Sequence, residues 1–539
     1  MQFHTQRITE MFQNMQHMNL FPFISTFTFN NNGSAVMSMY PKLPLYLYAF
    51  VRLLAQGPIT SYYIGNILSS FICLIISYYS FLSIHRDQKL AAFLFSTAYS
   101  LSALMICYSY NSADLGISFS LIFFPAAFAG FYCWLRDGSY KLMTLGVSAI
   151  LLCHLLNVIF TLVLLLLLAA SNFRLLNKKK IINLAKAFVI SILLTSSFWL
   201  PALRFGTSTA MNPPIVFPLV GVKLFDLFQR AFTNDNNFGF TIIAVLGLFL
   251  GAVDYKYLDK HVKQLFWASI IIVLFSSQLF PWQLLQNTPV RFIQFPWRFL
   301  VFPQLFLTYI YAVVVSELLK RLKTFQIRSL VVGIITVAIV LLSFNAQDRI
   351  ISSQIQAPEI NYQLNSNNYL PSRNGTIWFK VTNEDEFNNL MGFNANTDYL
   401  PKKSSGSFPA YSSHWGWNND TKKTVFFNMN AIPDGSIIQF DVPKSVKRLT
   451  VPFVIYNDHY QVILDNKKYP LKYDNNVLYI SNIKRGKHIM KISYHDPLIK
   501  NSFLILTILG TLLVWYEPQR WERLKSMIII KFKNKQQAK

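Results

Sequence analysis

The sequence has little charge for its length. Only 14% of its 539 residues are charged, whereas 53% are hydrophobic and 16% are aromatic. A single soluble core cannot hide so much apolar surface, and chains that stay unfolded are poor in aromatic and branched residues. These proportions exclude a water-soluble globular protein and a disordered chain.

Cysteine is scarce as well. All four cysteines, Cys73, Cys107, Cys133 and Cys153, fall inside apolar runs. The sequence holds no disulfide framework and no Cys-x-x-Cys metal site, so we expect these cysteines to be packing residues. We also expect no secretory signal, because residues 1–19 are polar and amphipathic rather than charged and then apolar.

Acidic residues are the third shortage. The 49 lysines and arginines outnumber the 24 aspartates and glutamates, and they lie in short clusters between apolar runs. A nucleic-acid-binding protein concentrates its basic residues along one stripe, whereas interrupted clusters are typical of orientation in a membrane. We therefore expect a lipid bilayer as partner and no nucleic acid.

Ten apolar segments have about the length needed to cross ~30 Å of hydrocarbon. They are residues 62–83, 89–108, 113–135, 142–170, 182–201, 238–253, 264–280, 298–318, 329–345 and 501–516. The loops after the first, third, fourth, sixth and eighth segments are basic, as is the C-terminal tail. Because lysine and arginine are enriched on the cytoplasmic side, this pattern predicts that these loops and the tail face inward.

One segment, 142–170, lies between two basic loops and must enter and leave on the same side. We expect two short helices broken near Cys153, His154 and Asn157, since irregular backbone at that depth is tolerated inside protein or a water-filled cavity. A single long tilted helix is the alternative. The hairpin gives about 11 crossings and places residues 1–61 outside. Either these residues cross the membrane unaided or an anchor helix ahead of them is missing from this chain, and we expect the second.

Five regions follow from this topology. Residues 1–61 form an extracytoplasmic first loop with interfacial helices at 2–18 and 43–56. Residues 62–345 form a transmembrane helical bundle, 346–500 an extracytoplasmic β-rich domain, 501–516 the last transmembrane helix, and 517–539 a basic cytoplasmic tail.

The β-rich region is polar and rich in asparagine. Period-two alternation predicts a β-sandwich whose strands lie at 375–381, 423–429, 436–442, 449–456, 460–466, 477–481 and 488–494. Turns are expected at Asp434-Gly435 and Arg485-Gly486. Three tryptophans, Trp378, Trp415 and Trp417, offer rings that sugars stack on, although burial inside the sandwich is the commoner role.

Two ionisable residues stand out at the membrane segments. Asp114 lies at the outer mouth of 113–135, where such a residue usually lines a cavity or pairs with a partner. His154 lies at the expected break in 142–170, where it is either a packed histidine or a proton carrier.

A cluster of cations surrounds a Pro-Trp break at the outer end of 298–318. The cations are Arg291 and Arg298, the amide of Gln294 lies between them, and Trp297 belongs to the break itself. A guanidinium group presents a fork of donors that holds phosphate oxygens at two points. Snorkelling to the lipid headgroups is the alternative for Arg298, and the same alternatives apply to Arg7.

Several short motifs are spread over the chain. They are Phe3-His4 with Arg7-Ile8, Asn32-Gly33, Tyr40-Pro41, Asp114 with Pro125, His154, GKHIMKISY before the last span, and above all Ile293-Gln-Phe-Pro-Trp-Arg298. Together they resemble the bacterial YfhO-like membrane proteins, also labelled 6-pyruvoyl-tetrahydropterin-synthase-related, which are similar to C-type glycosyltransferases. The resemblance covers essentially the whole chain.

The resemblance implies a polytopic α-helical membrane protein of the C-type glycosyltransferase kind with an extracytoplasmic β domain. It also implies an enzyme of the bacterial cell membrane that takes a sugar from a polyprenyl-phosphate donor. The acceptor would be a cell-envelope glycopolymer, a teichoic acid or polysaccharide, on the outer face.

Such a transfer requires a base near the acceptor hydroxyl and cations near the leaving phosphate. By resemblance, Asp114 and His4 are the catalytic candidates. The candidates for binding substrate and phosphate are Arg7, Tyr40, His154, Arg291, Gln294, Trp297 and Arg298. No cofactor is expected; a divalent metal stays open, although no ligand cluster in the sequence supports one.

One departure weakens the resemblance. Family members carry an acidic residue shortly before Phe-His, whereas this chain begins at Met1, so we expect an N-terminally shortened copy. Two further functions stay open: a transporter or flippase of lipid-linked sugars that uses the broken helix at 142–170, and a non-catalytic envelope scaffold. Against transport, the two halves show no inverted repeat of broken segments.

Overall fold

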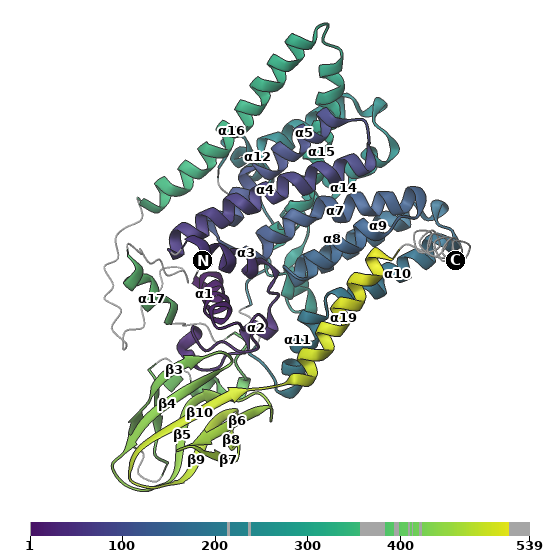
Figure 1. Ribbon diagram of the computed structural model, residues 1–539. Helices are drawn as coiled ribbons and strands as arrows, with labels where there is room; N and C mark the ends of the chain where they lie inside the picture. The colour runs from purple at the N-terminus through teal and green to yellow at the C-terminus, as the bar shows by residue number, and fades with distance from the viewer. Residues whose placement is uncertain are drawn as a thin grey trace, which may run out of the picture.

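The computed structural model describes residues 2–55, 57–212, 216–235, 239–355, 383–392, 398–407, 410–411, 413–419 and 423–516. Figure 1 shows a bundle of helices with a β-rich domain at one end. The helices are α1 (Gln2–Gln16), α2 (Val36–Met39), α3 (Leu43–Ala55), α4 (Pro58–Ile84), α5 (Lys89–Ser100), α6 (Ala103–Ile106), α7 (Leu115–Asp137), α8 (Lys141–Leu151), α9 (Leu155–Ser171), α10 (Lys178–Leu194), α11 (Ser196–Ser208), α12 (Leu224–Phe232), α13 (Ile242–Val253), α14 (Lys260–Ser276), α15 (Val301–Lys320), α16 (Phe325–Ile355), α17 (Glu384–Gly392) and α19 (Pro497–Trp515).

Each of the ten predicted apolar segments overlaps one or more helices among the described residues. Within the described residues, six helical runs are long and apolar enough to cross a membrane, and α10 with α11 makes a seventh if the pair is one span bent by 66°. The apolar helices α8, α9 and α13 are shorter. A mostly helical protein with several membrane helices is therefore confirmed, and the count of about 11 crossings stays a prediction.

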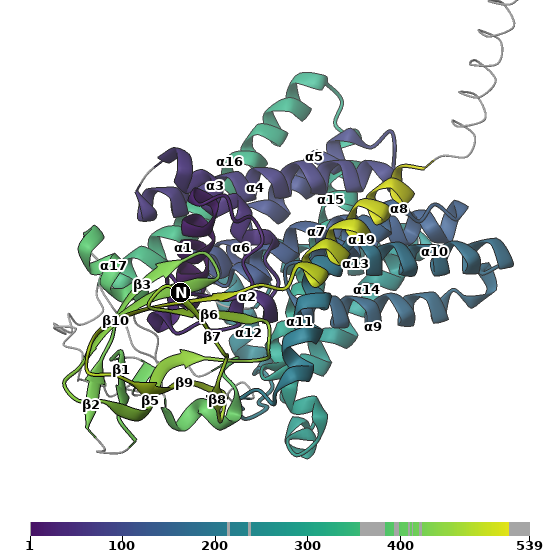
Figure 2. The same cartoon turned by 60° about the horizontal axis from the view of Figure 1, so that its bottom comes forward.

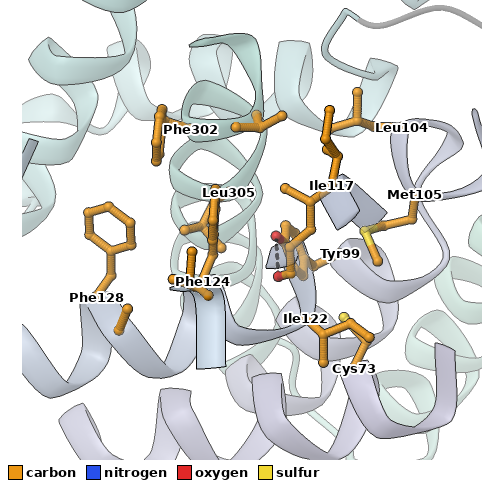
Figure 3. Close-up of a cluster of buried hydrophobic side chains, with 14 of the residues drawn as sticks. Cys73, Tyr99, Leu104, Met105, Ile117, Ile122, Phe124, Phe128, Phe302 and Leu305 are labelled. Carbon is orange, nitrogen blue, oxygen red and sulfur yellow. Dashed lines mark hydrogen bonds between the residues drawn. The ribbon is translucent and has the colours of Figure 1, made fainter. Parts of the chain in front are cut away.

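Helix α7 forms the centre of the bundle. In its most apolar 18-residue window 94% of the residues are buried, against 11% for the corresponding window of α16. Figure 3 shows part of the core that surrounds α7, where Phe124 stacks on Phe302 of α15 with ring centroids 5.2 Å apart. All four cysteines are free and buried, which confirms their packing role. The exposed apolar face of α16 is the kind of surface that lipid covers.

Helix α8 packs closely against α7 and runs antiparallel to it. A Cβ atom at Gly146 would lie 2.5 Å from the backbone nitrogen of Ala127, and one at Gly116 would lie 3.2 Å from the carbonyl oxygen of Cys153. Only glycine permits backbones to approach this closely. The chain therefore travels along α8 from the C-terminal end of α7 back to its N-terminal end.

Helix α9 then returns along the bundle. Near its start, Asn157 Nδ2 donates to Ser120 Oγ of α7 at 2.6 Å, and just past its end Asn172 Nδ2 donates to Gln264 Oε1 of α14 at 3.1 Å. Residues 152–154 break the helix between α8 and α9, as the basic flanks predict. The two helices thus form a hairpin whose turn lies at the N-terminal end of α7.

The first segment contains the two predicted helices, but α1 is not the half-exposed interfacial helix that its pattern predicts. Arg7 and Glu10 are at most 1% exposed. The Glu10 carboxylate accepts from the backbone N–H groups of Thr26, Phe27 and Thr28 at 2.9–3.1 Å. The polar face of α1 is therefore covered by the loop that follows it. An amphipathic pattern does not show whether protein or water covers the polar face of a helix.

The β-rich domain has two main sheets. The strands are β1 (Trp415–Trp417), β2 (Thr424–Phe426), β3 (Asn428–Ile432), β4 (Gly435–Val442), β5 (Val446–Val454), β6 (Tyr460–Leu464), β7 (Lys467–Tyr469), β8 (Tyr473–Asp474), β9 (Val477–Ile483) and β10 (Gly486–Tyr494). One sheet has the order β3-β4-β10-β6-β7, the other β5-β9-β8, and β1 pairs with β2. All pairings are antiparallel.

The two main sheets share one core, to which Ile438 and Met490 contribute from one sheet and Leu449 and Ile480 from the other. This arrangement agrees with the predicted sandwich, and turns occur at both predicted positions. The predicted strand 423–429 is wrong as a single strand, because Phe427 is buried and interrupts it between β2 and β3. The predicted strand 375–381, with Trp378, lies outside the described residues.

Close packing of α7 on α8 generates a stability prediction. Gly146→Ala is expected to lower the free energy of unfolding by about 1–3 kcal/mol, because the new methyl group overlaps the backbone of α7. The matched control is Gly333→Ala on α16, where nothing lies within 4 Å. Thermal unfolding in detergent measures both variants, and equal midpoints would contradict the close contact.

Candidate functional site

The N-terminal ends of α7 and α9 lie together at one end of the bundle. Asp114 caps α7, where its Oδ1 accepts from the N–H of Ile117 at 3.2 Å. His154 caps α9, where its Nδ1 accepts from the N–H of Asn157 at 3.2 Å. Unpaired N–H groups and the helix dipole make such ends attractive to anions.

A glycine permits a tyrosine and a histidine to meet at this place. A Cβ atom at Gly116 would lie 2.6 Å from Tyr40 Oη and 3.1 Å from His154 Cδ2. Gly116 thus lets Tyr40, from the segment between α2 and α3, approach the first turn of α7. The predicted site residues Tyr40, Asp114 and His154 therefore lie in one place.

The backbone that leads to Asp114 is irregular. The π-helix η2 (Cys107–Asn111) follows α6, and Ala113 has a φ of 46°. The N–H of Asp114 donates to the carbonyl of Tyr108 at 2.9 Å. Single π-helical turns and left-handed residues other than glycine cost energy and cluster at functional sites.

His4 of α1 contacts the Asp114 carboxylate. Its Nε2 lies 3.3 Å from Asp114 Oδ1, and the side chains are 9% and 25% exposed. The rings of Phe3 and Tyr40 stand edge-on to the imidazole, with centroids 5.1 and 5.9 Å away. Within the described part of the chain, His4 Nδ1 is buried and has no hydrogen-bond partner. The contact with Asp114 assigns the proton to Nε2 and leaves the Nδ1 lone pair available.

Arg7 lies one turn further along α1 and is 1% exposed. Its Nη2 donates to the carbonyls of Tyr40 and Pro41 at 3.1 and 2.7 Å, and its guanidinium carbon lies 4.5 Å from the centroid of the Tyr40 ring. Its Nε–H is buried and donates to none of the described residues. Burial lowers the pKa of Arg7 to about 10, so the guanidinium group stays charged at neutral pH.

Arg298 reaches the site from the short helix η7 (Pro296–Leu300) that precedes α15. Its Nη1 donates to the carbonyl of Ile293 at 3.1 Å and to Gln294 Oε1 at 3.0 Å. The guanidinium carbon lies 5.9 Å from the centroid of the Trp297 ring. The Nε–H of Arg298 is also buried and donates to no described residue.

The electrostatic field of this cluster favours the Asp114 carboxylate. Burial alone would raise the pKa of Asp114, but the hydrogen bond from His4 and the charges of His4, His154 and Arg298 outweigh burial. The pKa of Asp114 is therefore held well below its ordinary value. At neutral pH the site contains one carboxylate and two guanidinium groups.

The structure divides the nine site residues that the sequence predicts into two groups. It brings together His4, Arg7, Tyr40, Asp114, His154 and Arg298, with Gln294 and Trp297 at their edge through their contacts with Arg298. Arg291 is exposed, and none of the contacts of this cluster involves it. The Pro-Trp break explains the difference, because it turns Arg298 inward and leaves Arg291 on the preceding helix η6 (Pro289–Ile293).

Two tyrosines of the site are not apparent from the sequence. Tyr399 follows α17, and its ring centroid lies 6.4 Å from that of Tyr40. The ring centroid of Tyr108 lies 6.4 Å from that of Trp297. Tyr399 stands in a polar stretch without a motif, so nothing local marks it. Tyr108 lies six residues before Asp114, but only the irregular turn brings it back to the carboxylate.

No cation centre emerges from this geometry. In the parts of the chain that the structure describes, no three or more histidine, cysteine, aspartate or glutamate side chains converge on a point that a metal ion would fill.

Comparison with known proteins gives one match. The family model described as 6-pyruvoyl-tetrahydropterin synthase related domain, membrane protein, matches residues 37–351. The match runs from α2 to α16 and includes Asp114, His154 and Arg298. No curated protein and no solved structure matches the chain. The family expected from the sequence motifs is confirmed.

The His4–Asp114 contact generates a titration prediction. Burial lowers the pKa of His4 below 6.5, and Asp114 opposes this shift. Asp114→Asn is therefore expected to lower the His4 pKa further, because the charge that favours the imidazolium is gone. Histidine-selective ¹⁵N NMR, with His4→Gln to assign the signal, measures the change. The control is Asp226→Asn on α12, and a His4 pKa that Asp114→Asn leaves unchanged would refute the contact.

Proposed function

Because the chain belongs to the 6-pyruvoyl-tetrahydropterin synthase related family of membrane proteins, we propose that it is a C-type glycosyltransferase of a bacterial cell membrane. It takes a sugar from a polyprenyl-phosphate carrier and adds it to a cell-envelope polymer, a teichoic acid or polysaccharide, on the outer face. The match to the family supports the membrane setting, and the arrangement of the site supports the chemistry.

The observation that carries the proposal is a set of buried polar atoms around one carboxylate. Among the residues that the structure describes, the Nε atoms of Arg7 and Arg298 and the Nδ1 atom of His4 are all buried without a partner. A buried donor or acceptor without a partner costs about 1–3 kcal/mol. Three such atoms in one site indicate a polar ligand that supplies acceptors to the arginines and a hydroxyl to the histidine.

A phosphate group suits the two arginines. Each guanidinium group is fixed by its Nη atoms on backbone carbonyls, which leaves Nε in a set direction. Guanidinium groups and helix N-termini stabilise the negative charge that develops on a leaving phosphate. Arg7 and Arg298 would hold the phosphate of the carrier, with the N-terminal ends of α7 and α9 beside them.

The pair of His4 and Asp114 suits the acceptor. The acceptor hydroxyl gives its proton to His4 Nδ1 while its oxygen forms a bond to C1 of the sugar. The bond between C1 and the phosphate oxygen breaks, and the electron pair leaves with the polyprenyl phosphate. Asp114 holds the imidazole by Nε2–H and balances the charge that it gains.

The position of the basic loops supports an outward-facing site. Trp134 Nε1 donates to the carbonyl of Lys180, and the rings of His85 and His261 lie 5.5 Å apart, so the loops around these residues lie near the C-terminal end of α7. Asp114 lies at the other end, about 30 Å away at 1.5 Å per residue. Because basic loops face the cytoplasm, the site faces outward.

A matched pair of arginine variants tests the phosphate role. Arg298→Lys is expected to lower the rate of sugar transfer about 100-fold or more, because an ammonium group cannot reproduce a fixed guanidinium donor. Arg291→Lys makes the same change seven residues earlier on an exposed side chain and is expected to leave the rate unchanged. The assay follows labelled sugar from its polyprenyl-phosphate carrier into envelope polymer.

Equal loss in both variants, or in neither, would overturn this assignment. The wild-type protein could instead move the labelled carrier across the vesicle membrane without acceptor and transfer no sugar when acceptor is present. That result would indicate transport in place of transfer.

A further inference from the structure

The short sheet of β1 and β2 separates its side chains onto two faces. Gly416 and Val425 are paired and buried on the inner face. A methyl group at Gly416 would overlap the carbonyl oxygen of Thr450 in β5. The backbone of β1 therefore presses directly on β5, which forces the residues on either side of Gly416 to the outer face.

The outer face carries three aromatic rings. Trp415 and Trp417 are half-buried, with ring centroids 4.6 Å apart and planes tilted by 50°. Phe426 lies directly opposite Trp415 in the register and is 71% exposed. We call Trp415, Trp417 and Phe426 the aromatic face. Figure 2 shows β1 and β2 at an edge of the β-rich domain.

A series of packed residues connects β1 to the candidate site. His414, which precedes Trp415, contacts the carbonyl of Asn30 through Nε2 at 2.9 Å. The neighbouring Phe29 lies 5.8 Å from Phe3 between ring centroids. Phe3 adjoins His4 in the sequence and packs edge-on against it.

We propose that the aromatic face binds pyranose rings of the acceptor polysaccharide, at a distance from the sugar that is being transferred. This proposal rests on the proposed function, because it names the acceptor that reaches the His4–Asp114 pair. A pyranose presents a face of C–H groups, and these pack on the negative face of an aromatic ring while the hydroxyl groups stay in water. Two adjacent indoles and a phenyl ring offer places for successive sugars of one chain.

The surroundings of the face favour a polysaccharide over a lipid surface. Thr424 shares the outer face with Trp417 in the register, and exposed Lys423 and Asn419 flank the two strands. A membrane-binding patch would continue into exposed aliphatic residues instead. Residues 410–496 contain 12 lysines and arginines against seven aspartates and no glutamate, which adds attraction for an anionic polymer.

The test measures binding separately from transfer. The probe is total envelope polysaccharide, released from cells, freed of protein and lipid, and fluorescently labelled. Full-length protein in detergent is expected to bind it, and Trp415→Ala with Trp417→Ala is expected to weaken binding at least tenfold. Replacement of both by phenylalanine should restore most of the affinity, because phenylalanine keeps an aromatic surface. The matched control is Tyr473→Ala, which removes an exposed aromatic ring from β8.

Kinetics separate this inference from the proposed function. In the transfer assay the double alanine variant is expected to raise KM for polymeric acceptor with kcat retained, whereas Arg298→Lys should lose transfer and keep polysaccharide binding. If the double alanine variant still binds the polysaccharide, or if the wild type does not bind it, the proposed role of the aromatic face is refuted. A second outcome would also overturn the proposal. If the double alanine variant no longer binds protein-free vesicles of anionic lipid but still binds the polysaccharide, the aromatic face binds the membrane.

Discussion

A half-buried carboxylate at the end of an apolar bundle is the constraint on which the site depends. An unpaired buried charge costs several kcal/mol, so Asp114 requires compensation from every element around it. His4 supplies a hydrogen bond, while the charge of Arg298 and the first turn of α7 add attraction. Because these groups come from α1, α7 and η7, the first segment, the central helix and the Pro-Trp break must all meet at one place. The Glu10 carboxylate fixes α1 there by binding the loop at Thr26–Thr28.

Much of the fold follows from local patterns. Apolar length predicts the helices, basic flanks predict the break between α8 and α9, and alternation predicts five of the strands, because each of these signals lies within one segment. Part of the site follows as well. Asp114 and Arg298 attract notice because charge is rare in apolar sequence, and a rare charge must be paired or functional.

The remaining features depend on contacts between distant segments. The sequence treats Arg291 and Arg298 alike, yet only packing at the Pro-Trp break decides which one turns inward. Tyr399 joins the site from beyond α17, and α1 is buried by its own loop, so neither follows from periodicity. The aromatic face depends on a single close approach of Gly416 to β5, which makes two tryptophans half-exposed where a sandwich core is the ordinary expectation.

The most direct test of the account asks whether the buried guanidinium donors bind phosphate. Native mass spectrometry of the wild type should show one bound polyprenyl phosphate, and the polyprenol of equal chain length should bind about 100-fold more weakly. This preference for the phosphate should disappear when Arg7 and Arg298 are both replaced by glutamine. Equal binding of phosphate and alcohol by the wild type would contradict the account, because the site would then recognise only the hydrocarbon chain.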